Sequence, residues 1–261
     1  MTSGRDVLQL EFLATGTWQH VFVEGRDEER TWVYKIPAAY GRLLPFDHPQ
    51  RFRPEGLTAG AAYALGARLP GARALLAARL RRRSAGEFEA MLALVEFMCA
   101  GRLSDLLLPC EVLRDAEAVL RVGGRSIAYR GHALKQRRAE RLFERNENLR
   151  ALDWGEVVEA HHRLWRHGVT FKSTTAVLGL KNWALFDGRL RLFDTSSLTR
   201  DPRLVSRALA PEELDRREQR AREKQAAGGD TSEPLVEFLR FIRREINRGK
   251  LEQLWRADLR G

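Results

Sequence analysis

The chain has 261 residues, a length that suits one large domain or two small ones and allows a substantial hydrophobic core. Hydrophobic residues make up 44% and charged residues 31%, which is typical of a folded protein rather than a disordered one. No stretch approaches the roughly 20 apolar residues needed to span a bilayer, and the first residues lack the apolar run of a secretory signal. The sequence therefore predicts a cytoplasmic protein without a transmembrane segment.

The net charge of +10 indicates an acidic partner, and arginine supplies most of it. Residues 66–83 carry six arginines and no acid, and residues 121–150 carry nine basic residues against three glutamates. Such segments attract nucleic acid, anionic lipid or phosphorylated substrates, although a solvated surface explains them equally well. No nucleic-acid-binding motif accompanies the charge, so nucleic acid is not favoured. A basic protein that binds nucleic acid or a membrane surface, without a nucleotide site, stays as the alternative function.

The cysteines and histidines do not indicate a metal site. Cys99 and Cys110 are too few for a disulfide framework or a zinc site, and we expect both to be reduced core residues. His161 and His162 are adjacent on a predicted helix and point about 100° apart, so they cannot chelate one ion together. Both histidines are predicted to be structural or surface residues.

The first half of the chain reads as strands with one helix. Residues 7–13, 19–23 and 31–37 alternate with turns and predict an antiparallel meander that ends at Pro37. Residues 38–83 contain four prolines and predict a loop followed by short helices. A helix is expected over 84–100, capped by Ser84 with Glu87 three residues on. Further strands are expected at 111–114, 117–122 and 125–130, the last two joined by a Gly-Gly turn.

The second half changes to helical spacing. Asp153 caps a helix that ends at Gly168, and residues 183–186 and 190–193 predict a hairpin around Asp187-Gly188. Helices are expected at 211–226, 234–246 and 251–255. The pattern predicts an α+β protein of two lobes: residues 1–130 form a β-meander with helix 84–100, and residues 131–261 form a helical lobe with the hairpin 182–194.

Three features in the first lobe match what ATP requires from a protein. The turn 13–18 contains Gly16 and can cover phosphates, although an ordinary hairpin turn would look the same. Lys35 lies on a strand among apolar neighbours and can neutralise the α and β phosphates; a solvent-exposed edge lysine is the plainer reading. Helix 84–100 then offers a carboxylate to pair with Lys35: Glu87, Glu89 or Glu96, of which spacing favours Glu89.

In the second lobe, Asn182 and Asp194 stand at the two ends of one predicted hairpin. The twelve-residue separation with a turn between brings the two side chains close. Hard cations such as Mg²⁺ prefer oxygen ligands of this kind. The pair therefore predicts a metal site, against the plainer reading of an Asn at a strand start and an Asp in a turn.

The order of these motifs resembles the protein-kinase-like superfamily, specifically bacterial kinase-like proteins of the regulatory, small-molecule or lipopolysaccharide kinase type. The resemblance rests on Lys35, on the Leu164 to Val169 segment, on Asn182 and on Asp194-Thr195-Ser196, and it covers roughly residues 7–200. It implies a two-lobed fold and binding of ATP with Mg²⁺, held by Asn182 and Asp194.

The chain departs from that family at the residue expected to be the catalytic aspartate. Ser173 stands there, and no Asp or Glu occurs between Glu159 and Asp187. Lys172 could add charge stabilisation. The sequence thus predicts either an atypical Mg²⁺-dependent phosphotransferase or a degenerate pseudokinase with a regulatory role. Its acceptor would be an anionic small molecule, a lipid or a protein.

Overall fold

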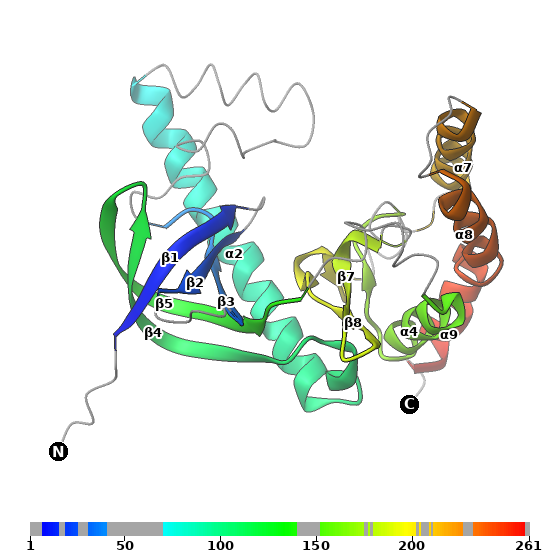
Figure 1. The fold of residues 1–261 in the computed structure, drawn as a ribbon, viewed down its shortest axis with the longest axis horizontal. Coiled ribbons are helices and arrows are strands. Elements are labelled where there is room, and N and C mark those ends of the chain that lie inside the picture. Colours follow the sequence, from blue (N-terminus) through cyan, green and yellow to red (C-terminus); the bar gives the residue numbers. More distant parts are fainter. Residues whose placement is uncertain are drawn as a thin grey trace. The chain divides into compact units, whose positions relative to one another are not determined.

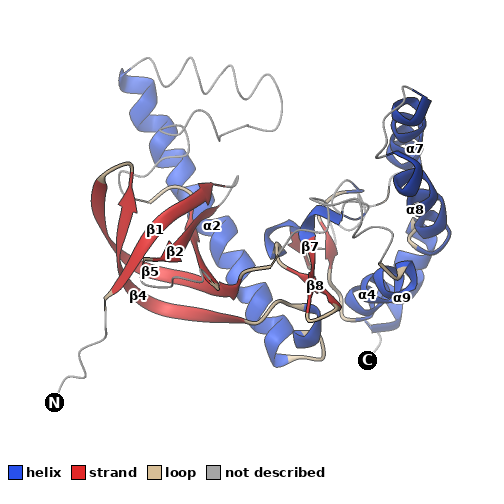
Figure 2. Ribbon diagram, viewed as in Figure 1, coloured by secondary structure: helices blue, strands red, loops and turns tan. Residues whose placement is uncertain are grey.

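The computed structural model of the chain describes residues 7–15, 19–25, 31–40, 70–139, 152–174, 177, 180–201, 204, 209, 211–226 and 232–258. The chain divides into two compact units. Unit 1 comprises residues 1–96 and 109–138, and unit 2 comprises residues 97–108 and 139–261. Figure 2 shows long strands gathered in unit 1 and short strands accompanied by helices in unit 2.

Unit 1 is built on a closed five-stranded barrel in the order β1-β2-β3-β5-β4 (Figure 1). The strands are β1 (Leu8–Thr15), β2 (Gln19–Glu24), β3 (Trp32–Pro37), β4 (Cys110–Val122) and β5 (Arg125–Arg137). Neighbours pair antiparallel except β1 and β4, which run parallel from Leu8 opposite Ala118 to Glu11 opposite Arg121. This parallel pair closes the barrel.

Alternate residues of each strand face the interior of the barrel, and these inward-facing residues are apolar. Phe22, Tyr34 and Leu120 are almost completely buried in one cluster with inward residues of the other strands. The β4–β5 hairpin turns at Gly123 and Gly124, which both have positive φ (56° and 77°). That conformation matches the twist of a two-residue hairpin, and glycine adopts it without strain.

The predicted fold class, a two-lobed kinase-like fold with an antiparallel meander, is wrong. The strands exist where the sequence predicts them, but they close into a barrel through the parallel pairing of β1 with β4. Closure joins segments far apart in the chain, and local alternation of apolar residues carries no information about it. The predicted strands 111–114 and 117–122 are also one strand, since β4 continues through a bulge between Leu113 and Ala116.

The first helix of the described residues, α2 (Pro70–Ala100), begins earlier than predicted. Pro70 is its first residue, a position where the missing N–H and fixed φ of proline suit a helix. The Ala-, Leu- and Arg-rich stretch after it has high helix propensity and continues into the predicted segment. Ser84 is therefore no N-cap: it is buried in mid-helix, where its Oγ accepts a hydrogen bond from the backbone N–H of Ala39 (3.3 Å).

Ion pairs join helix α2 to the barrel, and the helix also buries apolar residues of its own. Phe88, Leu92 and Val95 are buried at helical spacing. On β4, Arg114 donates to Glu96 (2.7 Å) and Glu89 (3.2 Å) of α2. The ion pairs are half exposed, so the apolar face supplies most of the stabilisation.

Unit 2 contains four α-helices among its described residues: α4 (Trp154–Arg166), α7 (Pro211–Ala226), α8 (Ser232–Glu245) and α9 (Arg248–Asp258). Its short elements are η2 (Ser104–Leu106), β6 (Thr170–Phe171), η4 (Leu180–Asn182), β7 (Trp183–Phe186), β8 (Arg189–Leu192), η5 (Thr195–Ser197) and β9 (Leu198–Thr199). As predicted, Asp153 caps α4, accepting from the Gly155 N–H (2.8 Å). Helix α4 packs against α8 and α9, and α7 packs against α8.

Two smaller predictions concern the burial of the two cysteines and the lack of a transmembrane segment. Cys99 is exposed rather than buried, because it lies off the apolar face of α2, and Cys110 is half-buried; the two cysteines form no disulfide. None of the helices in the described part of the chain is both long enough and apolar enough to cross a bilayer.

Arg163 of α4 clamps the segment that contains η2. Its guanidinium donates to both carboxylate oxygens of Asp105 (2.6 and 2.9 Å) and to the carbonyl of Arg102 (2.8 Å). The hydrogen bond from Arg163 also holds the pKa of Asp105 below its ordinary value. We expect Arg163→Ala to lower the free energy of unfolding by about 1 kcal/mol, since both partners are partly exposed.

Arg166→Ala is the matched control on the same helix, since Arg166 contacts only Glu159 (3.0 Å) among the described residues. Urea denaturation of both variants measures the difference. Equal losses for the two variants would show that the Arg163 clamp adds nothing beyond a surface ion pair.

Candidate functional site

The candidate site lies at the open end of the β7–β8 hairpin in unit 2. The hairpin turns at Asp187 and Gly188, both with positive φ, and Trp183 pairs with Leu192 at its other end. One step beyond that pair, the Phe193 N–H donates to the carbonyl of Asn182 (3.0 Å). The hairpin thus places Asn182 and Asp194 at the same end, where the two strands of the hairpin separate from each other.

Asp194 is fixed by the turn that follows it. Its Oδ1 caps η5 by accepting from the Ser196 N–H (3.1 Å) and also from the Ser196 hydroxyl (2.6 Å). Among the described residues, both side-chain hydrogen bonds of Asp194 go to Oδ1. Its Oδ2 is therefore available to a ligand while the carboxylate stays oriented.

Buried polar atoms without a hydrogen-bond partner occur on Asn182 and Trp183 at the open end of the hairpin and on Thr195, the residue after Asp194. These atoms are Asn182 Nδ2, Trp183 Nε1 and Thr195 Oγ1, on residues that are at most 3% exposed; Gln19 Oε1 on β2 of unit 1 is another such atom among the described residues. A buried donor left without an acceptor costs about 1–3 kcal/mol. Buried polar atoms that are unpaired within the protein are satisfied by water, an ion or a ligand, so these three atoms are candidates for ligand contact.

The loop that carries Lys172 and Ser173 reaches the same turn. Strand β6 pairs with β9, so Phe171 stands opposite Leu198, and the Lys172 N–H donates to the Ser197 carbonyl (2.7 Å). Ser173 is exposed, and its carbonyl accepts from the Val177 N–H (3.0 Å). The backbone of Lys172 therefore lies beside Ser197 and that of Asn182 beside Phe193, and Ser173 follows Lys172 in the chain.

A cluster of buried aromatic rings surrounds His161 next to strands β6 and β7. The ring of His161 lies 5.5 Å from the rings of Phe171, the last residue of β6, and Trp183, the first residue of β7. Both His161 nitrogens contact backbone carbonyls, Nδ1 with Val157 (2.8 Å) and Nε2 with Val177 (3.1 Å). Burial lowers the pKa of His161 to about 4, so the ring is neutral at physiological pH and donates to one carbonyl only. His161 is structural, as predicted.

Lys35 and Glu89 belong to unit 1. Lys35 is 4% exposed on β3, on the outer face of the barrel, because its neighbours Tyr34 and Ile36 face the interior. Glu89 pairs with Arg114 and lies 4.0 Å from His132 Nε2. Which carboxylate faces Lys35 stays a prediction, and Gly16 lies outside the described residues.

Sequence reasoning missed the buried polar atoms of Trp183 and Thr195. Tryptophan in a strand reads as core, and threonine in a turn reads as a cap, so neither residue carries a signal in the sequence. Their importance appears only when burial and hydrogen bonding are known.

The two predicted metal ligands at the hairpin end carry oxygen atoms, the ligand type that Mg²⁺ prefers. In the described residues, no three His, Cys, Asp or Glu side chains come together. Asn182 and Asp194 instead offer one amide and one carboxylate oxygen. Magnesium typically takes one or two such protein ligands and completes its coordination with water and phosphate oxygens.

Comparison of the chain with protein-family models gives no match, and comparison with curated proteins gives none either. The functional assignment therefore depends on the site itself.

Proposed function

We propose that unit 2 binds the phosphates of ATP through Mg²⁺ at the open end of the β7–β8 hairpin. Asn182 and Asp194 would hold the ion, and Lys172 would add positive charge beside it. The observation that carries the proposal is the group of buried polar atoms without partners, Asn182 Nδ2, Trp183 Nε1 and Thr195 Oγ1, next to an oriented carboxylate.

A phosphate oxygen is the complement of these atoms. It accepts hydrogen bonds from N–H and O–H donors, and its negative charge attracts both the metal ion and the lysine. The amide of Asn182 can serve both partners, since its oxygen ligates a cation while its NH₂ donates to a phosphate oxygen. A neutral or cationic ligand would satisfy the donors poorly and would gain nothing from the metal.

Transfer of the phosphoryl group would be of an atypical kind. Ser173 cannot act as a carboxylate base, and the loop around it contains no acid. Phosphoryl transfer depends mainly on positioning and charge stabilisation, which Asn182, Asp194 and Lys172 can provide. The protein is then either a slow phosphotransferase acting on an anionic small molecule, lipid or protein, or a regulatory protein that binds ATP without consuming it. ATP turnover that depends on Asp194 distinguishes the two.

Isothermal titration of ATP with Mg²⁺ into wild type and variants tests the proposal. We expect Asp194→Ala and Asn182→Ala to weaken binding at least tenfold, about 1.4 kcal/mol or more, because each removes a metal ligand. Omission of Mg²⁺ should weaken binding by wild type in the same way. Without any measurable binding by wild type, the proposal fails.

Asp187→Asn is the matched control. Asp187 lies in the turn of the same hairpin, at the end away from the site, and its positive φ of 50° is tolerated by asparagine. This variant removes one carboxylate from the hairpin and should bind like wild type. If it weakened binding as much as Asp194→Ala, net charge rather than ligation would explain the affinity.

A further inference from the structure

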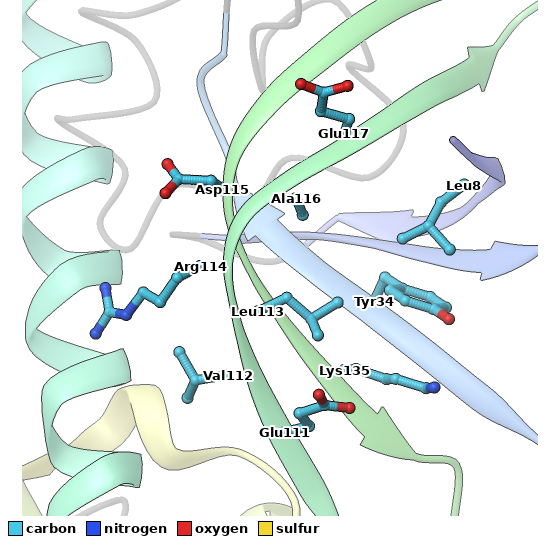
Figure 3. A pocket seen from close by; sticks show the side chains of 10 residues that line it. All are labelled: Leu8, Tyr34, Glu111, Val112, Leu113, Arg114, Asp115, Ala116, Glu117 and Lys135. Atoms are coloured by element: carbon cyan, nitrogen blue, oxygen red, sulfur yellow. The ribbon is translucent and has the colours of Figure 1, made fainter. Parts of the chain in front are cut away.

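A second candidate site lies in unit 1, at the end of the barrel where β1 and β4 begin. A pocket of about 400 Å³ opens there beside the β4 bulge, lined by residues of β1, β3, β4 and β5 (Figure 3). At the bulge, Asp115 has a positive φ of 57°, and its N–H donates to His132 Nδ1 (3.3 Å). Bulges and strained residues of this kind are frequent beside binding sites.

The floor of the pocket is apolar. Leu8, Leu113 and Ala116 pack against the barrel core, and the buried ring of Tyr34 is part of that core. The Tyr34 hydroxyl is occupied, because it donates to Glu24 (3.1 Å). In Figure 3, Leu113 and Tyr34 lie on one side of β4, whereas Arg114 and Asp115 point to the other side, toward α2. A ligand in the pocket would therefore rest on carbon atoms.

Three charged groups that line the pocket have no ionic partner in the described part of the chain; Asp115 points away toward α2 (Figure 3), and the other two are Lys135 and Glu111. They stand directly opposite each other on β5 and β4. The Lys135 ammonium lies over the ring of Trp32, 5.0 Å from its centroid, and 6.0 Å from that of Tyr34. The other long charged side chains of the pocket are engaged, Arg114 with Glu96 and Glu117 with Arg130 (3.6 Å).

We propose that this pocket binds a small zwitterion with an apolar side chain, the chemistry of a free apolar α-amino acid. The ligand carboxylate would meet Lys135, its ammonium would meet Glu111, and its side chain would cover Leu8, Leu113 and Tyr34. Directly opposite residues of an antiparallel pair are about 5 Å apart at Cβ, so the ends of these two long side chains can both reach the charged groups of one small ligand. A simple anion would face Glu111 and a simple cation would face Lys135, so each would meet one like charge. This site is separate from the proposed phosphate site and does not depend on it.

Titration calorimetry with phenylalanine, 3-phenylpropionate and phenethylamine tests the charge requirement. The three compounds share the aromatic body and differ in their charged groups. We expect wild type to bind phenylalanine and to bind the two singly charged analogues at least tenfold more weakly. Lys135→Met and Glu111→Gln should weaken phenylalanine binding by a similar factor. Arg121→Gln, an exposed position near the far end of β4, is the control and should leave binding unchanged.

Amide chemical shifts of the ¹⁵N-labelled wild-type protein give a second readout that needs no variant to fold. Phenylalanine should shift the amides of Leu8, Leu113 and Lys135 and leave the hairpin 183–192 unchanged. The proposal is overturned if these amides do not move at about 10 mM phenylalanine. Equal binding of all three compounds, or unchanged binding in both Lys135→Met and Glu111→Gln, would overturn it as well.

Discussion

Replacing Trp165 by alanine should lower the free energy of unfolding by about 3–5 kcal/mol, the usual cost of removing a large aromatic ring from a core. Trp165 has no exposed surface, and its Nε1 donates to the Thr170 hydroxyl (3.0 Å). The substitution therefore creates a cavity and also leaves a buried hydroxyl without its donor. Because Thr170 begins β6, the loss reaches the strand that positions Lys172.

Trp154→Ala on the same helix is the control for this substitution. Trp154 is only partly buried at the start of α4, where it contacts Phe238 and Phe241. Trp154→Ala should lower the free energy of unfolding clearly less than Trp165→Ala, because part of the Trp154 surface is already in water. Urea denaturation monitored by circular dichroism measures both variants. If Trp154→Ala cost as much as Trp165→Ala, the core of unit 2 would not be centred on Trp165.

Acid should destabilise the protein through His161 by about 3 kcal/mol. Burial lowers the pKa of this imidazole from 6.5 to about 4; the positive charge of nearby His162 acts in the same direction, and the two backbone carbonyls oppose it. Above about pH 6.5 the ring is neutral in both folded and unfolded chains, so it adds no pH dependence. As the pH falls from 6.5 toward 4, the unfolded chain binds a proton that the folded chain excludes, and stability decreases over that range.

The stability difference between wild type and His161→Gln isolates this effect. Glutamine does not titrate, so the carboxylates that respond to acid in both proteins cancel in the difference. We expect wild type to lose about 3 kcal/mol more than His161→Gln between about pH 7.5 and about pH 4. If the difference in unfolding free energy between wild type and His161→Gln stayed constant over this pH range, the pKa of His161 would be the same in the folded and the unfolded chain.

Local elements could be predicted from the sequence because their signals are local. The alternation in 19–23 and 31–37, the Gly123-Gly124 turn and the Asp153 cap all appear in the structure. Barrel closure could not be predicted, since the pairing of Leu8 with Ala118 leaves no trace in either segment alone. The early start of α2 could not be predicted because the four prolines of residues 38–83 favour a loop with short helices, whereas Pro70 is the first residue of one long helix.

The candidate site could be predicted only in part, because some of its contacts join segments that are distant in the sequence. Asn182 and Asp194 could be placed together because one short hairpin connects them. The approach of Lys172 to Ser197 depends on the pairing of β6 with β9, two strands of two residues each that have no sequence signature. The pocket on the barrel was missed entirely, since Lys135 and Glu111 become neighbours only through the register of β4 with β5.

Paramagnetic broadening by Mn²⁺ tests the proposed phosphate site most directly. Mn²⁺ replaces Mg²⁺ at oxygen sites and broadens the amide signals of residues near the ion. In ¹⁵N-labelled protein with ATP, we predict that broadening centres on Asn182, Asp194 and Ser196 and is lost in Asp194→Ala. Broadening centred elsewhere in the chain, or no ATP-dependent broadening at these three amides, would contradict the assignment of the hairpin end as a metal–nucleotide site.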